Sequence, residues 1–157
     1  MALKKTVLVV TLATCFLFAV AGAQEDTALR RRLLPKEIDA LAQTGAGAGT
    51  SGVAGIQTRV LKGDPTRTGL YTIQLTVLAN TRIEAHVHPD DRVATVVSGT
   101  WYFGYGSRFD EKELKALAPG SFYTEPPNVA HFARTGNEPV VVQISGYGPT
   151  GTRYTER

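Results

Sequence analysis

Hydrophobic and polar positions alternate along most of the chain after Ile56, in short runs separated by turn residues. Period-two alternation with many β-branched and aromatic residues is typical of strands that bury one face. The residues between the runs are rich in glycine, proline and asparagine, which form turns. Seven runs fit this description: IQTRVLKG, LYTIQLTVLA, TRIEAHVH, RVATVVSGTWYFGYG, GSFYTEPP, AHFARTG and PVVVQISGYG. The pattern predicts an all-β sandwich or barrel.

One segment departs from the strand pattern. The sequence FDEKELKALAPG, which starts at Phe109, has a capping candidate at Asp110, early acidic residues and a Pro-Gly stop. Leu114 and Leu117 are three residues apart, so they would lie on one face of a helix. These features predict a short surface helix inserted between two strands, with its leucines against the barrel.

The region before the strands has two parts. Residues 36–42 are helix-compatible and follow Pro35, and proline suits the first turn of a helix. The run TGAGAGTSGVAG, residues 44–55, is rich in glycine and alanine and predicts a flexible linker. We therefore expect an N-terminal segment over residues 24–55, a single barrel domain over residues 56–150 and a C-terminal tail over residues 151–157.

The first 23 residues differ from the rest of the chain. Lys4 and Lys5 precede an apolar run over residues 6–20, and Ala-Gly-Ala follows at residues 21–23. This order is typical of a secretory signal peptide, and the run is shorter than the ~20 residues of a membrane-spanning helix. We expect cleavage before Gln24, export to the periplasm or the exterior, and no membrane anchor afterwards.

Cleavage would change the charge and the cysteine content. The chain has 17 basic and 14 acidic residues and one cysteine, Cys15. Subtracting Lys4 and Lys5 leaves 15 basic against 14 acidic residues, a net charge of +1, so no nucleic-acid-binding surface is expected. Without a disulfide, the exported domain must be stabilised by its own core, with help from a bound metal or a second subunit.

All three histidines of the chain lie in the strand region. His86 and His88 belong to the run TRIEAHVH, and His131 lies near the start of AHFARTG. Alternate residues of a strand face the same side at a spacing of ~6.6–6.8 Å, so Glu84, His86 and His88 are expected on one face. Two imidazoles at this spacing can converge on one ion, and only His131 is left to supply a third nitrogen. The histidines therefore predict a metal site.

These residues resemble the two motifs of the cupins. His86-x-His88 followed by Gly99 resembles the first motif, and Pro119-Gly120 followed by EPPNVAHFA with His131 resembles the second. The resemblance implies a double-stranded, jelly-roll-like β-barrel, often a homodimer. It also implies a divalent metal, commonly iron, manganese, zinc or nickel, for which His86, His88 and His131 match the three histidine ligands of the family.

One position departs from the family pattern. Four residues after the second histidine, where cupins usually carry a glutamate ligand, this chain has Arg92, and an arginine cannot bind a cation. Three interpretations of the site are compatible with this substitution. The histidines hold a metal with open positions, which resembles the thiol-dioxygenase branch of the family. A shifted register lets Asp91 supply the carboxylate, or Glu84, on the same face as the histidines, supplies it. Alternatively, the site holds no tight metal and Arg92 binds an anionic substrate.

The chemistry of three histidine ligands favours particular kinds of reaction. Three neutral imidazoles leave the charge of a divalent metal uncompensated, which favours anionic co-ligands, O₂ at Fe(II), or a lowered pKa for Zn-bound water. The sequence favours a metalloenzyme, an oxygenase or a metal-assisted lyase or hydrolase, that acts on a small anionic molecule. The alternative is a non-catalytic module that binds or senses a small molecule. Glu125 is expected to be a solvated turn residue, with a general base or an acceptor for a histidine N–H as its alternative role.

Overall fold

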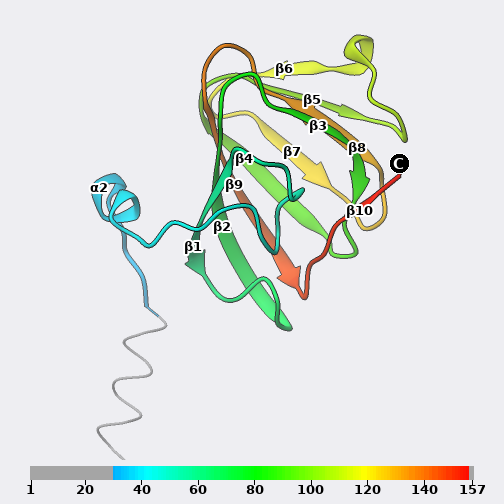
Figure 1. Ribbon diagram of the computed structural model, residues 1–157. Helices are drawn as coiled ribbons and strands as arrows, with labels where there is room; N and C mark the ends of the chain where they lie inside the picture. Colours follow the sequence, from blue (N-terminus) through cyan, green and yellow to red (C-terminus); the bar gives the residue numbers. More distant parts are fainter. Residues whose placement is uncertain (1–29, 156–157) are drawn as a thin grey trace, which may run out of the picture. The chain divides into compact units, whose positions relative to one another are not determined.

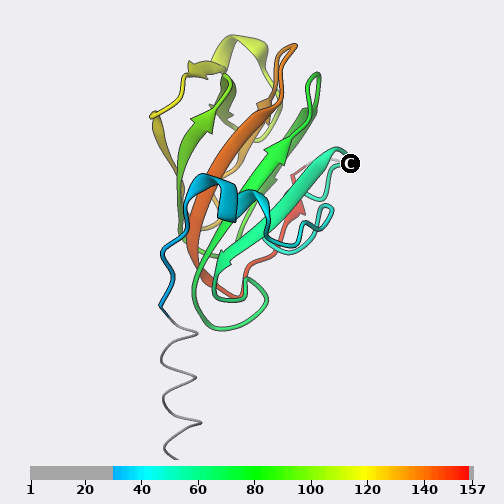
Figure 2. The ribbon, with the colours of Figure 1, turned by 90° about the vertical axis from the view of Figure 1, so that its left-hand side faces the viewer.

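The computed structural model describes residues 30–155, so the signal-peptide prediction and Cys15 lie outside the described residues. Residues 34–155 belong to one compact unit, which contains two five-stranded sheets with antiparallel pairing. The two sheets face each other and enclose the core (Figures 1 and 2). The prediction of an all-β, jelly-roll-like barrel is therefore confirmed.

Each of the seven predicted runs contains a strand. The first sheet has the order β1 (Ile56–Lys62), β2 (Gly69–Val77), β9 (Val140–Gly148), β4 (Arg92–Ser98) and β7 (Phe122–Glu125). The second has the order β10 (Arg153–Tyr154), β3 (Arg82–Val87), β8 (His131–Arg134), β5 (Trp101–Tyr105) and β6 (Lys115–Leu117). The longest run divides into β4 and β5 at Gly99, where a φ of 74° favours glycine.

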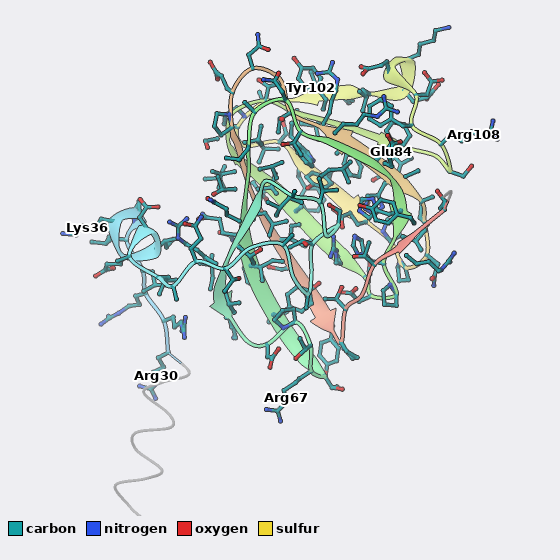
Figure 3. All side chains as sticks on the ribbon, viewed as in Figure 1. Arg30, Lys36, Arg67, Glu84, Tyr102 and Arg108 are labelled. Carbon is teal, nitrogen blue, oxygen red and sulfur yellow. The ribbon has the colours of Figure 1, made fainter. Side chains whose placement is uncertain are left out.

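Alternate strand residues fill the space between the sheets. Along β2, every second residue from Tyr71 to Val77 is buried, and β9 repeats the pattern from Val140 onwards. Trp101 and Phe103 of the second sheet join the same apolar cluster. Burial of each such side chain contributes ~1.5–3 kcal/mol. Long charged side chains such as Arg67 extend outwards instead (Figure 3).

The predicted helix after Phe109 is wrong. The chain forms a single 3₁₀ turn, η1 (Glu111–Glu113), and then β6, which pairs with β5. Asp110 does cap the turn, because its carboxylate accepts the backbone N–H of Lys112 at 2.9 Å. Leu117 is buried in the core as expected. So short a helix is marginal in water, whereas the edge of β5 offers partners for the backbone N–H and C=O groups.

The helix-compatible segment contains one short helix, α2 (Pro35–Asp39), with Pro35 in its first turn. The carboxylate of Glu37 accepts the backbone N–H of Leu34 at 2.6 Å, which caps the helix. None of its residues is buried, so the helix adds nothing to the core. No helix in the described part of the chain is long and apolar enough to cross a membrane.

Residues 44–55 differ from the flexible linker that their composition predicts. Thr44 forms a β-bridge with Thr58, and Gly49, Thr50 and Ser51 are buried. Figure 1 shows this part of the chain, in cyan, lying back over the barrel. Small residues permit the approach, because a Cβ atom at Gly49 would lie only 2.7 Å from Cδ1 of the core residue Ile73. The glycine-rich composition therefore serves close packing.

The residues after 150, expected as a tail, also take part in the fold. β10 pairs with the end of β3, with Tyr154 opposite His86. The Tyr154 hydroxyl donates to the carbonyl of Ser51 at 2.7 Å, and the Thr152 hydroxyl donates to that of Thr50 at 2.6 Å. We call residues 47–52 and 151–154 the closing segments, because together they cover the side of the barrel beside His86.

Candidate metal centre

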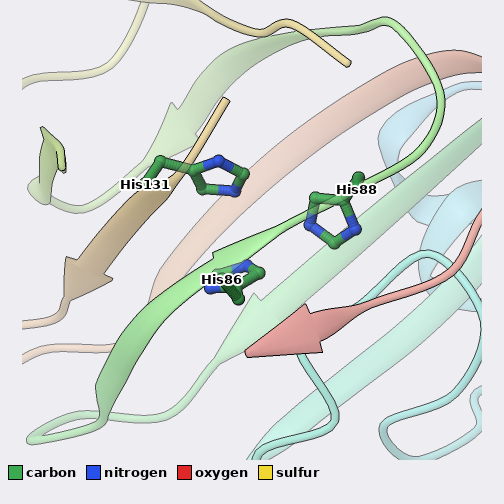
Figure 4. A group of neighbouring side chains, drawn as sticks. All are labelled: His86, His88 and His131. Atoms are coloured by element: carbon green, nitrogen blue, oxygen red, sulfur yellow. The ribbon is translucent and has the colours of Figure 1, made fainter. Parts of the chain in front are cut away.

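Three histidines lie together inside the barrel (Figure 4). His86 is in β3, His88 follows that strand, and His131 is the first residue of β8, directly opposite His86 in the pairing of the two strands. Their exposed fractions are 4%, 1% and 2%. One nitrogen from each ring lies within 4.8 Å of the others, so the group could hold a metal ion.

Each ring is fixed by a hydrogen bond between Nδ1 and a backbone carbonyl. The pairs are His86 with Glu84 at 2.8 Å, His88 with Gly151 at 2.7 Å and His131 with Val129 at 3.1 Å. A carbonyl only accepts, so each neutral ring carries its proton on Nδ1 and keeps the Nε2 lone pair free. The Nε2 atoms of His88 and His131 are buried without a partner. Such orphaned acceptors are rare, and a metal ion would satisfy them.

Burial keeps the histidines neutral. Desolvation lowers the pKa of His86 to about 4 and that of His88 to about 3, and it also lowers the pKa of His131. The positive charge of Arg92 acts in the same direction on all three. Because metals bind the neutral imidazole, these rings are in the ligating form at neutral pH. The donor set therefore fits a divalent metal.

Glu84 does not share the face of the histidines. The pairing of β3 with β8 shifts by one residue between Ile83 and His86, as in a β-bulge. Ile83 and His86 are consequently both buried, while Glu84 is exposed and pairs with Arg82 at 2.6 Å. Asp91 is exposed as well. Neither side chain is inside the barrel. The hypothesis that Glu84 or Asp91 supplies a carboxylate ligand is therefore wrong.

Arg92 forms a buried ion pair with Glu125. The two residues lie opposite each other in β4 and β7, with exposed fractions of 2% and 4%. Nε of Arg92 donates to Oε2 of Glu125 at 2.7 Å, and Nη2 donates to the same oxygen. Nη1 donates to the carbonyl of Gly49 in the first closing segment at 3.0 Å. Arg92 thus lies beside the histidines as expected, but the anion it contacts is a carboxylate of this chain.

Glu125 is not the solvated turn residue that the sequence predicts. It is buried, and its Oε2 lies 3.8 Å from Nε2 of His88 and 3.7 Å from Nε2 of His131. Burial raises its pKa, but the guanidinium of Arg92 outweighs this effect and lowers the pKa to about 2. A charged carboxylate therefore faces the imidazole nitrogens, where the sequence predicted a solvated turn residue.

A small cavity adjoins these groups. Its free volume is about 30 Å³, and its wall includes His86, His131, Arg92 and Glu125 together with aromatic side chains. A space of this size accommodates one or two waters or small ligand atoms. Gly49, Thr50 and Ser51 of the first closing segment also line it. The first closing segment therefore forms part of the wall that limits the size of this cavity.

No protein-family model matches the chain, and no curated protein matches its sequence significantly. Solved structures do resemble it. The polyketide cyclase RemF from Streptomyces resistomycificus is 15% identical, with a TM-score of 0.63 over 82% of this chain and 87% of that one. A sugar phosphate isomerase of the cupin superfamily from Silicibacter pomeroyi is 14% identical, with a TM-score of 0.59 over 81% and 83%.

A third similar structure is that of the DMSP lyases RdDddP and RnDddQII, at 19% identity and a TM-score of 0.54. The match covers 64% of this chain but only 53% of the lyase chain, so this chain spans about half of that protein. At these identities the likeness concerns the fold. Together with the two facing antiparallel sheets and the enclosed histidines, it shows that this chain has the cupin fold.

Proposed function

We propose that this chain binds one divalent metal ion through His86, His88 and His131, and that this centre acts on a small anionic molecule. One observation carries the proposal. Three buried, neutral imidazoles have their Nδ1 atoms bonded to carbonyls, and two of them leave an Nε2 atom without a partner in the same small space. Iron, manganese, zinc and nickel are the candidate metals, because all are compatible with nitrogen and oxygen ligands.

The charges around the site favour an anionic substrate. Arg92 and Glu125 cancel each other, and the three imidazoles are neutral. A divalent ion held there would keep its full charge in a poorly solvated interior, where an anion is attracted more strongly than in water. When bound, such an ion supplies Lewis acidity, a lowered pKa for a bound water or, if it is iron, O₂ chemistry.

The residues of this chain would contribute orientation and the exclusion of water. The backbone carbonyls of Glu84, Gly151 and Val129 fix the rings. Trp101, Phe103 and Tyr123 line the rest of the cavity with apolar surface. Structural neighbours named as a lyase, an isomerase and a cyclase support a small-molecule enzyme on this fold, although a fold hosts many functions.

A second candidate function is a non-catalytic binding or sensing module. The observation that favours it is the small cavity of about 30 Å³, which the first closing segment covers through Gly49, Thr50 and Ser51. In such a module the metal would have a structural role, and the small molecule would bind to the barrel without reaching the metal. The two functions therefore differ in whether the metal has accessible coordination positions.

Access to the metal separates the two functions. The full chain, loaded with Co²⁺ as a spectroscopic substitute, is titrated with azide while the visible absorption is recorded. If the chain is an enzyme, we expect a saturable spectral change, because azide occupies an open coordination position of the metal. If the chain is a closed binding module, we expect an unchanged spectrum. A His131→Ala protein is the control, since it should not develop the Co²⁺ spectrum. A wild-type chain that binds none of Co²⁺, Fe²⁺, Mn²⁺, Ni²⁺ and Zn²⁺ would refute the metal centre itself.

A further inference from the structure

We propose that Glu125 is the fourth protein ligand of the metal centre, and that it replaces the glutamate whose usual cupin position is occupied by Arg92. The inference rests on the proposed three-histidine site and specifies its ligand set. It concerns a residue on a different strand from the usual one. The carboxylate comes from β7, at the end of the strand, rather than from β4.

The Glu125 carboxylate lies close to two of the three proposed ligands, His88 and His131. Metal–nitrogen and metal–oxygen bonds of ~2.0–2.2 Å place two ligand atoms of one ion roughly 3.0–3.5 Å apart. The Oε2 atom of Glu125 already lies 3.8 Å from Nε2 of His88 and 3.7 Å from Nε2 of His131. An ion between these three atoms would need them to approach by only about 0.2–0.8 Å. Small rotations of the side chains can supply such a shift.

The pairing of β4 with β7 explains how Glu125 can take the place of the usual glutamate. Arg92 and Glu125 are direct partners in the antiparallel pairing of β4 with β7, and both are buried on the inner face. Side chains in such a pair start about 4.5–5.5 Å apart. A carboxylate on either strand can therefore reach the same interior space. This chain keeps one negative ligand at the centre while the strand that supplies it changes.

The contacts of Arg92 explain how a charged carboxylate stays in place without a metal. Nε and Nη2 both donate to Oε2 of Glu125, the oxygen nearest the histidines, and Nη1 is held by the carbonyl of Gly49. These bonds hold the Glu125 carboxylate in place, with Oε2 facing the imidazoles of His88 and His131. A divalent ion would compete with the guanidinium for the same oxygen, or would take the second oxygen after a rotation of the carboxylate.

Two substitutions at Glu125 test ligation. Glu125→Gln keeps a hydrogen-bond acceptor for Arg92 but removes the charge, and Glu125→Asp keeps the charge but shortens the reach. Zn²⁺ affinity is measured by calorimetry and Co²⁺ coordination by visible absorption, on the full chain. We expect both variants to lose tenfold or more in affinity and to change the Co²⁺ spectrum. Asp91→Asn, which changes an exposed carboxylate next to Arg92 in the sequence, is the matched control and should behave like wild type.

Wild-type affinity and spectrum in either Glu125 variant would overturn the inference. In particular, an aspartate variant that keeps both would show that Glu125 acts only through its charge. Failure of the three-histidine site is a separate result, because the wild-type chain itself would then bind no metal, and both proposals would fall together. If metal binding depends on the histidines but the Glu125 variants bind like wild type, only the assignment of Glu125 as the fourth ligand is overturned.

Folding of the variants is controlled by a paired substitution. Glu125→Gln leaves the buried Arg92 without its counter-ion, and this can unfold a protein. Replacing both partners, as Arg92→Met with Glu125→Leu, removes the buried charges together and is usually tolerated. Circular dichroism checks that this double variant folds. We expect it to show the same weakened Zn²⁺ binding and altered Co²⁺ spectrum as Glu125→Gln, and wild-type binding in the double variant would overturn the proposal.

Discussion

Replacing Gly49 with alanine should destabilise the barrel more than the same replacement at Gly52. Both glycines belong to the first closing segment and have positive φ angles, 88° and 78°. A Cβ atom at Gly49 would lie 2.7 Å from Cδ1 of Ile73, whereas a Cβ atom at Gly52 would have nothing within 4 Å. The two variants therefore share the backbone strain and differ in the contact with the core.

The size of the difference follows from these contacts. A left-handed conformation costs a non-glycine residue about 1–2 kcal/mol, and this applies to both variants. Ile73 is fully buried, so its methyl group cannot move into solvent. Overpacking of this kind costs about 1–3 kcal/mol. We therefore expect Gly49→Ala to lower the free energy of unfolding by about 2–5 kcal/mol and Gly52→Ala by about 1–2 kcal/mol.

Thermal unfolding followed by circular dichroism measures the difference. For a folded unit of this size, the extra 1–3 kcal/mol at Gly49 corresponds to a melting temperature lower by about 3–15 °C than that of Gly52→Ala. Both variants are compared with wild type in metal-free buffer. Equal shifts for the two variants would contradict this prediction, because they would show that the segment does not pack against the core and is the loose linker that its composition suggests.

Three further predictions concern the localisation of the protein, the segment after Phe109 and the pH dependence of stability. Expressed with residues 1–23, the protein should be recovered outside the cytoplasm with Gln24 as its N-terminal residue; a membrane-bound form that still begins at Met1 would contradict this. Leu117→Asp should lower the free energy of unfolding by several kcal/mol because Leu117 is buried, whereas the exposed Lys112→Ala should change it by less than about 0.5 kcal/mol, as measured by urea denaturation. In metal-free buffer, stability should be fully present above pH 6.5, the ordinary pKa of histidine in an unfolded chain. It should fall as the pH drops toward about 4, because unfolding lets the histidines take up protons that burial excludes. Urea midpoints that stay constant over this range would contradict the assignment of neutral, buried histidines.

Much of the fold was predictable because the side-chain period of a strand is two. A run such as residues 70–79 with one buried face has only one register that hides its apolar residues, so its alternation survives in the structure. The insert shows the limit of such patterns. Leu114 and Leu117 fit a helical spacing, but the free edge of β5 offers hydrogen bonds that the sequence does not reveal.

Part of the candidate site could also be predicted from the sequence, and part could not. His86, His88 and His131 could be predicted because few residue types bind metals and the chain has only three histidines. The outward turn of Glu84 depends on a one-residue register shift, which leaves no trace in the alternation. The inward position of Glu125 depends on which strand pairs with β4, and this is a long-range property of the sheet.

The proposed function depends on three buried histidines that hold one divalent metal ion. Its most direct test is the metal content of the full chain, purified without a histidine tag, loaded with Zn²⁺, dialysed and analysed by mass spectrometry of the metal. We expect one ion per chain for wild type and for Asp91→Asn, and almost none for His86→Ala, His88→Ala and His131→Ala. A metal-free wild type, or histidine variants that retain the ion, would contradict the three-histidine centre.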